Sequence, residues 1–249
     1  MPPLEILGCR VDDVDLAEAA ARIVAYARDG GHHRVVTLGT EMIVYARRDP
    51  VYRAVVNASD LVVADTIGVV CASRLHGVPL RGRVAGIELL ERLCELAAQE
   101  QLPIYLLGAA PDVARATAGV LAARHPGLRV AGARDGYFAP EQAAEVAAAI
   151  RASGARILFA ALGFPKQERF LADWLAASGA GVGMGVGGSF DVLAGRLPRA
   201  PQALRRLGLE WLYRLVREPR RWRRQMALPL FVWLAVLDRV GIKKGTRAS

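Results

Sequence analysis

Cysteine is scarce in this sequence, and the few cysteines form no pattern. Cys9, Cys71 and Cys94 are widely separated among 249 residues, and none belongs to a Cys-x-x-Cys pair. Neither a disulfide framework nor a thiolate metal site is supported, because both need paired cysteines at short or repeated spacings. The sequence therefore fits a protein of a reducing compartment, for which we expect the cytoplasm.

The signatures of several enzyme classes are also absent. No segment combines Gly-x-Gly-x-x-Gly spacing with an acidic residue at the expected distance, and there is no Gly-Lys-Ser/Thr phosphate loop. The four histidines show no metal-binding spacing, no Asp-x-Asp follows a predicted strand, and no serine lies in a Gly-x-Ser-x-Gly elbow. We expect no metal, no dinucleotide cofactor and no serine nucleophile.

No apolar run is long enough to cross a membrane. The continuous run at residues 227–237 has 11 residues, whereas a helix needs about 20 to span the hydrocarbon layer. The N-terminus has no basic region followed by an apolar stretch, so we expect no signal peptide. Any contact with a membrane would be made at its surface.

Alternation of strand and helix patterns is the main organising feature. Short apolar runs predict buried strands at residues 35–38, 61–63, 104–107, 128–130, 157–162 and 182–186. Amphipathic periodicity predicts helices at residues 16–28, 87–99, 113–124, 141–152 and 167–177. This order predicts an α/β fold, a Rossmann-like parallel sheet with helices on both faces, which binds ligands beyond the carboxyl ends of its strands.

Positive charge is concentrated at one end of the chain. Residues 1–197 hold 20 basic and 21 acidic side chains, a net charge of −1, whereas residues 198–249 hold 13 and 3, a net charge of +10. We therefore divide the chain into a Rossmann-like core, residues 1–197, and a basic helical C-terminal appendage, residues 198–249. Such an excess of charge indicates an anionic partner, or else a solvated charged helix.

Glycines and polar residues follow the predicted strands, where ligands bind. Glycine allows the backbone to approach a phosphate closely, and a following helix offers unpaired N–H groups. The candidate positions of this kind are Gly108, Gly163, Gly185, Gly187 and Asp191.

Two side chains at strand ends are candidates for chemistry. Asp65 directly follows Leu-Val-Val-Ala, where a partly desolvated carboxylate would act as a base. The alternative is that Asp65 caps a helix from Thr66 to Arg74. The hydroxyl of Thr37 would hydrogen-bond a sugar or cap a turn.

Three further polar residues are suited to binding a nucleotide sugar. Lys166 is the only lysine before Lys243 and would hold donor phosphate, while Gln167 would contact sugar or base; otherwise both are ordinary residues of a first helical turn. Arg83 lies in a polar loop and would neutralise a pyrophosphate, unless it is simply solvated.

The appendage interleaves arginine with large apolar residues, including Trp222 and Trp233. This composition is typical of an interfacial anchor on an anionic membrane surface. The alternative is an ordinary C-terminal helix docked on the core or on another subunit. Nucleic acid is not expected as a partner, because no helix-turn-helix, zinc or base-stacking motif accompanies the arginines.

Several strings in fixed order resemble the WecG/TagA/CpsF family of glycosyltransferases (glycosyltransferase family 26), and the resemblance runs through nearly the whole chain. They lie at residues 58–65, 132–138, 162–168, 185–195, 199–201 and 207–219. The family usually has Asn where this chain has Gly39, Pro-Asp-Gly where it has Ala64-Asp65-Thr66, and a basic residue in place of Pro198.

The resemblance implies metal-independent, inverting transfer of a sugar, N-acetylmannosamine or a related hexose, from a UDP-sugar to a polyprenyl-diphosphate-linked sugar. It implies no cofactor and a peripheral location at the cytoplasmic face of the cell membrane, and self-association is compatible with it. By resemblance, Asp65 is the general base, with Thr37, Arg83 and Gln167 at the substrate. Asp135, Gly136 and Tyr137 are implied at the nucleotide sugar, and Arg214, Arg221 and Arg224 at the acceptor diphosphate or leaving group.

Two functions of other classes remain as alternatives at this stage. One is a nucleotide-dependent oxidoreductase on a Rossmann-like sheet, against which the missing glycine fingerprint argues. The other is a membrane or nucleic-acid adaptor led by the basic tail.

Overall fold

The core of the protein is a six-stranded, wholly parallel β-sheet, seen in a computed structural model that describes residues 4–206, 210–217, 222 and 226–239. The strand order is β4-β3-β8-β7-β5-β6. The strands are β3 (His33–Leu38), β4 (Leu61–Ala64), β5 (Ile104–Gly108), β6 (Val130–Arg134), β7 (Ile157–Ala161) and β8 (Val182–Gly185). The predicted α/β class and parallel sheet are confirmed.

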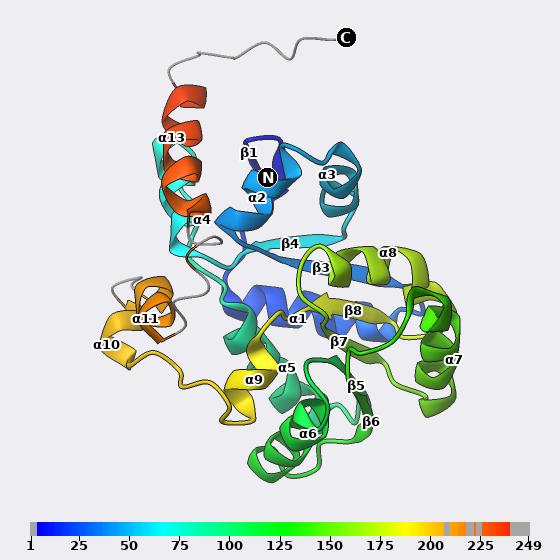
Figure 1. Ribbon diagram of the computed structural model, residues 1–249. Helices are drawn as coiled ribbons and strands as arrows, with labels where there is room; N and C mark the ends of the chain where they lie inside the picture. The colour runs from blue at the N-terminus through cyan, green and yellow to red at the C-terminus, as the bar shows by residue number, and fades with distance from the viewer. Residues whose placement is uncertain (1–3, 207–209, 218–221, 223–225, 240–249) are drawn as a thin grey trace.

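Helices cover both faces of this sheet (Figure 1). They are α1 (Leu16–Arg28), α2 (Thr40–Ala46), α3 (Pro50–Asn57), α4 (Ile67–Leu75), α5 (Gly86–Gln99), α6 (Val113–Arg124), α7 (Ala143–Ser153), α8 (Lys166–Ser178) and α9 (Ser189–Leu193), with a 3-10 turn, η1 (Pro140–Gln142), before α7. A separate hairpin of β1 (Leu4–Ile6) and β2 (Cys9–Val11) precedes them.

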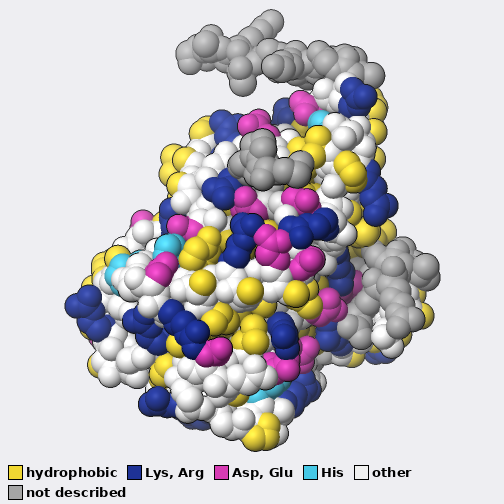
Figure 2. Space-filling view, turned by 180° about the vertical axis from the view of Figure 1, so that it is seen from behind, with side chains coloured by type: hydrophobic (Ala, Val, Ile, Leu, Met, Phe, Trp, Pro, Cys, Tyr) yellow, Lys and Arg dark blue, Asp and Glu magenta, His cyan; other side chains and the backbone are white. Residues whose placement is uncertain are grey.

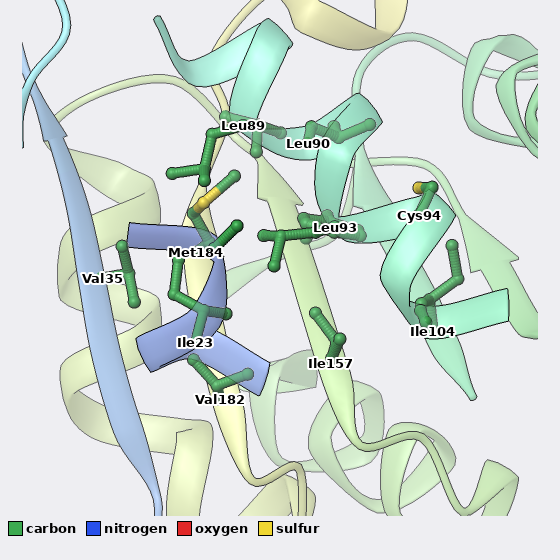
Figure 3. Packing of buried hydrophobic residues seen from close by; sticks show 14 of the residues in the cluster. Ile23, Val35, Leu89, Leu90, Leu93, Cys94, Ile104, Ile157, Val182 and Met184 are labelled. Atoms are coloured by element: carbon green, nitrogen blue, oxygen red, sulfur yellow. The ribbon is translucent and has the colours of Figure 1, made fainter. Parts of the chain in front are cut away.

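Alternate residues of each strand pack against opposite layers of helices. Val35 and Met184 face a cluster that includes Ile23 of α1 and Leu93 of α5, as Figure 3 shows. Val36, next along β3, belongs to a different cluster under α2, α3 and α4. Burial on both faces explains why these strands read as continuous apolar runs, and why they were recognisable in the sequence.

The prediction misplaced one of the two edge strands of the sheet, β6. The prediction put it at residues 128–130, whereas β6 runs from Val130 to Arg134. All five residues of β6, which pairs only with β5, are half-buried, whereas all four residues of the other edge strand, β4, are buried. The buried Leu128 instead donates its backbone N–H to His125 O in the turn after α6.

Short elements around the site also differ from the prediction. The hairpin and helices α2 and α3 were not predicted; α2 and α3 have only 7 and 8 residues, about two turns each. The helix predicted at residues 141–152 is divided between η1 and α7. The long helices α1 and α6 match their predicted bounds.

The C-terminal appendage is helical, as predicted. Its described helices are α10 (Gln202–Arg206), α11 (Glu210–Arg217) and α13 (Ala227–Arg239). Helix α13 lies along α2 and α4 (Figure 1), and its Phe231 and Ala235 are buried in the same cluster as those helices. Helix α13 is therefore docked on the core, which was the alternative to an interfacial anchor in the sequence analysis. The division at residue 197 stays a prediction.

The opposite side of α13 is apolar and exposed. Val232, Trp233 and Val236 expose 52%, 61% and 43% of their surfaces. Within the described part of the chain, no helix combines the length and the hydrophobicity that crossing a bilayer would require.

Candidate functional site

A cavity of about 300 Å³ lies beyond the carboxyl ends of β3, β4, β7 and β8. Its walls come from the segments that follow these strands, from the start of α5, and from Glu210, Trp211 and Leu228 of the appendage. Thr37, Asp65, Arg83, Gly163, Gln167 and Gly187 all line it. The structure therefore brings the four predicted catalytic positions together with two of the predicted nucleotide-sugar positions.

Asp65 is held at the cavity wall by two strand-end interactions. Its backbone N–H donates to Leu38 O at 3.0 Å, and its Oδ1 accepts a hydrogen bond from Gly86 N, the first residue of α5, at 2.7 Å. This hydrogen bond caps the start of α5, whereas the alternative predicted a cap for the helix after Thr66. The residue before α4 is Thr66, whose side chain makes no cap hydrogen bond among the described residues.

Thr37 links two neighbouring strands at the floor of the cavity. Its hydroxyl donates to Gly185 O at 2.9 Å, across from β3 to β8. Only 8% of the residue is exposed. Since the hydroxyl proton is committed to Gly185, the oxygen faces a ligand as an acceptor.

Gln167 is oriented by a chain of buried hydrogen bonds. Its Nε2 donates to Glu168 Oε1 at 2.8 Å, and its Oε1 accepts from Gly187 N at 3.1 Å. Gly185 is required beneath it, because a Cβ there would lie 2.5 Å from Gln167 Nε2. Burial raises the pKa of the Glu168 carboxyl, which is 2% exposed. These contacts orient the Gln167 amide so that its oxygen points to the Gly187 loop.

Arg83 connects the core to the appendage. Its Nη1 lies 3.4 Å from Glu210 Oε2 in α11, and its Nη2 lies 3.9 Å from Glu88 Oε1 in α5. Arg199 reaches Glu88 as well, at 2.8 Å. The Arg83 side chain is 18% exposed, so it is not a fully solvated loop arginine. Such a partly buried cation, placed at a cavity, is suited to binding a phosphate.

The remaining predicted nucleotide-sugar residues lie beside the cavity or away from it. Gly108, the last residue of β5, lies beside Gly136, two residues after β6, and a Cβ on Gly108 would lie 2.4 Å from the Ala161 backbone. Asp135 Oδ1 accepts from Tyr137 N at 2.9 Å, and Tyr137 is 75% exposed. Lys166 is exposed at the start of α8, and Asp191 lies half-buried in α9.

The three arginines of the appendage cannot be placed in the same way. Arg214 belongs to α11, but its side chain is not among those described. Arg221 and Arg224 lie outside the described residues. Their predicted role at a diphosphate stays a prediction.

Several cavity residues were not assigned to the site from the sequence. Phe164, Glu210, Trp211 and Leu228 form its outer wall. Phe164 belongs to a segment that follows a strand, and the other three belong to the appendage. Their positions in the chain were the only indication that they line the cavity. Their convergence depends on how α11 and α13 fold back, which periodicity does not specify. The described residues contain no group of three or more His, Cys, Asp or Glu side chains arranged to hold a metal ion.

Comparison with known proteins gives a consistent result. The chain matches the Glycosyl transferase WecG/TagA/CpsF family over residues 4–245. It is 39% identical over 198 residues to a Bacillus spizizenii N-acetylglucosaminyldiphosphoundecaprenol N-acetyl-beta-D-mannosaminyltransferase, covering 80% of this chain and 76% of the relative. It is 35% identical over 210 residues to the Bacillus subtilis protein of the same name, covering 84% and 81%.

Proposed function

Because this chain belongs to the WecG/TagA/CpsF family of glycosyltransferases, we propose that it transfers N-acetylmannosamine from a UDP-linked donor to undecaprenyl-diphosphate-linked N-acetylglucosamine. The names of its relatives from two Bacillus species support this donor sugar and this acceptor. The product would serve the synthesis of a cell-surface polymer such as teichoic acid. An oxidoreductase or a non-enzymatic adaptor does not fit membership of this family.

The observation that carries the proposal is the meeting of Asp65, Arg83 and Gln167 in one cavity at the carboxyl edge of the sheet. In the proposed reaction the Asp65 carboxylate takes the proton of the acceptor hydroxyl. The oxygen then attacks the anomeric carbon from the face opposite UDP, the bond between that carbon and the UDP oxygen breaks, and UDP leaves. Attack from the opposite face inverts the anomeric centre.

Four other groups would support this displacement. The Gly86 N–H holds the Asp65 carboxylate in a fixed orientation, Thr37 and Gln167 would hydrogen-bond the sugars, and Arg83 would bind the diphosphate of the acceptor. The ends of β5 and β6, with Gly108, Asp135, Gly136 and Tyr137, would receive the nucleotide. We propose that no metal takes part, which accords with the absence of an Asp-x-Asp after any of the six strands of the parallel sheet.

We further propose that the enzyme works at the cytoplasmic face of the cell membrane. Its acceptor would carry a lipid, and its appendage combines a net charge of +10 with the exposed Val232, Trp233 and Val236 of α13. Cationic and aromatic side chains of this kind bind an anionic lipid surface without crossing it.

Replacement of Asp65 tests the proposal directly. The assay is release of UDP from UDP-N-acetylmannosamine in the presence of an undecaprenyl-diphosphate-N-acetylglucosamine analogue. We expect Asp65→Asn to lower kcat by at least about a hundredfold, the usual scale for loss of a general base. The matched control is Asp173→Asn, which changes an exposed aspartate of α8 outside the cavity. Unchanged turnover in Asp65→Asn would exclude this residue as the base.

A further inference from the structure

An apolar groove of about 450 Å³ lies next to the candidate cavity. The described residues that line it come from α11, from the start of α13 and from Trp222 between them: Trp211, Leu215, Trp222, Met226, Leu228 and Pro229. No charged side chain is among them. Trp211 and Leu228 line the groove and the candidate cavity alike, so the two spaces share a wall.

Apolar surface continues from the groove along α13. Pro229, at the end of the groove, is followed at helical spacing by Val232, Trp233 and Val236, which are exposed on the same side of the helix. Trp222 and Met226, within the groove, are themselves 55% and 56% exposed. From Pro229 to Val236 the helix advances by about 10 Å. Exposed apolar surface arranged in a continuous path is the mark of a binding site for an apolar partner.

Groups of three chemical types follow one another along this path. Asp65 lies in the cavity, and Arg83 lies at its outer side because it pairs with Glu210, the residue before Trp211. Beyond Trp211 the lining is apolar. The carboxylate of Asp65 is suited to a sugar hydroxyl, and the guanidinium of Arg83 is suited to a diphosphate. The apolar groove beyond them is suited to a hydrocarbon chain.

From this order we infer that the groove binds the first isoprene units of the acceptor's polyprenyl chain and so brings its diphosphate to Arg83. The inference rests on the proposed function, because it takes the lipid-linked acceptor from there. An isoprenoid is favoured over a phospholipid acyl chain or a second copy of this protein, because only the acceptor has a polar head that must occupy the adjoining cavity at the same time.

Photolabelling of the full-length protein tests occupancy of the groove without any transfer reaction. The probe is a farnesyl diphosphate analogue that carries a benzophenone in its chain. We expect the label on Trp222 or Met226, and protection by unlabelled farnesyl diphosphate but not by dispersed phosphatidylglycerol. Label found elsewhere would overturn the inference. Equal protection by phosphatidylglycerol would overturn it too, because the groove would then be a general lipid-contact surface.

A pair of neighbouring substitutions tests the effect on catalysis. Leu215 lines the groove, whereas Val216, the next residue of α11, is 71% exposed and lines neither space. In detergent solution we expect Leu215→Gln to raise KM roughly tenfold for a farnesyl-diphosphate-linked acceptor, through loss of apolar contact. KM for an acceptor with a methyl group in place of the chain should not change. Val216→Gln should behave as wild type with both acceptors.

The outcomes separate the inference from the proposed function. If Leu215→Gln impairs transfer equally with both acceptors, Leu215 has a structural role and the inference is overturned. Sugar transfer by the wild type would still support the proposed function. If the wild type transfers no sugar to any acceptor, the proposed function fails, and photolabelling alone decides the inference. Should Leu215→Gln not fold, Met226→Gln at a more exposed position of the groove replaces it, with the same expected result.

Discussion

At the scale of single residues, Gly39 leaves room in the cavity that a larger side chain could fill. A Cβ at this position would meet only Thr66 Cγ2, at 3.5 Å, among the described atoms within 4 Å, and its φ of −103° suits any residue. Gly39 also precedes α2 as its N-cap, where asparagine is slightly better than glycine. Space and backbone therefore both permit the asparagine that is usual in the family.

We predict that Gly39→Asn keeps or raises stability by a few tenths of a kcal/mol. The new amide would gain or lose one hydrogen bond to a sugar, which corresponds to a change of about tenfold in the ratio of kcat/KM between two UDP-sugars. Thermal unfolding and a comparison of UDP-N-acetylmannosamine with UDP-N-acetylglucosamine measure both effects. Gly77→Asn, in an exposed turn outside the cavity, is the control. An unchanged ratio would mean that residue 39 does not face the sugar.

Glu168 makes stability depend on pH. Burial raises the pKa of its carboxyl in the folded protein, so the native state holds this proton more tightly than the unfolded chain does. The group therefore favours folding most at pH values below the usual pKa of glutamate, and this contribution is lost as the pH rises through the raised value.

Glu168→Gln should remove this dependence, because an amide does not ionise and its oxygen can still accept from Gln167. The free energy of unfolding of the variant, minus that of wild type, should rise with pH by about 1.4 kcal/mol per unit between the usual and the raised pKa. Urea unfolding at several pH values measures it. A difference that stays constant with pH would contradict the assignment.

The sequence was sufficient to place Asp65, Thr37 and Gln167 at one edge of the sheet, because Asp65 directly follows the apolar run of β4, Thr37 lies near the end of β3, and Gln167 lies in the first turn of the helix after β7. It did not reveal their partners. The bond from Gly86 to Asp65 crosses 21 positions, and the one from Thr37 to Gly185 crosses 148. Contacts at such separations depend on strand order, which a single sequence does not fix.

At the scale of secondary-structure elements, α13 contributes one side to the core and leaves the other in solvent. Phe231 is 1% exposed, whereas Trp233, two residues later, is 61% exposed. Phe231→Ala should lower the free energy of unfolding by about 3–5 kcal/mol, the usual cost of removing a buried phenylalanine side chain. Trp233→Ala should change it by less than about 0.5 kcal/mol.

Chemical unfolding of the two variants measures this contrast. Phe231→Ala should also reduce transfer, since Leu228 lines the cavity from the same helix. If both variants unfold like wild type, α13 does not depend on Phe231 for its position.

The hydrophobic pattern of the sequence was a reliable guide to the long helices and to the strands that are buried on both faces. It failed for β6, whose residues are all half-buried, and for α2 and α3, which have only about two turns each.

At the scale of the whole molecule, the uneven distribution of charge governs encounters with a membrane. The face in Figure 2 mixes both signs of charge. Arg81 is one of several arginines that pair with acidic neighbours in the structure. The excess of ten positive charges belongs to residues 198–249. Attraction to anionic lipids is worth about 1 kcal/mol per nearby basic residue and is screened by salt.

We therefore predict that the protein sediments with vesicles containing phosphatidylglycerol at about 0.1 M salt and is largely released at about 1 M, where the screening length falls to about 3 Å. Phosphatidylcholine vesicles should bind it weakly at either salt concentration. Equal binding to both kinds of vesicle would show that the apolar side chains, not the charge, hold the protein at the surface. Composition alone sufficed to locate this charge, whereas the position of α13 against the core required the structure.

The place of Leu228 in the cavity wall has a consequence for synthesis in the cell. The sheet, with Asp65 and Gln167, is complete once residue 197 has left the ribosome, but Trp211 and Leu228 come later. A nascent chain that has already formed its parallel sheet is therefore still without part of its substrate pocket. The proposed activity would therefore begin only when translation is nearly finished, and a product that ends before Trp211 should show no turnover.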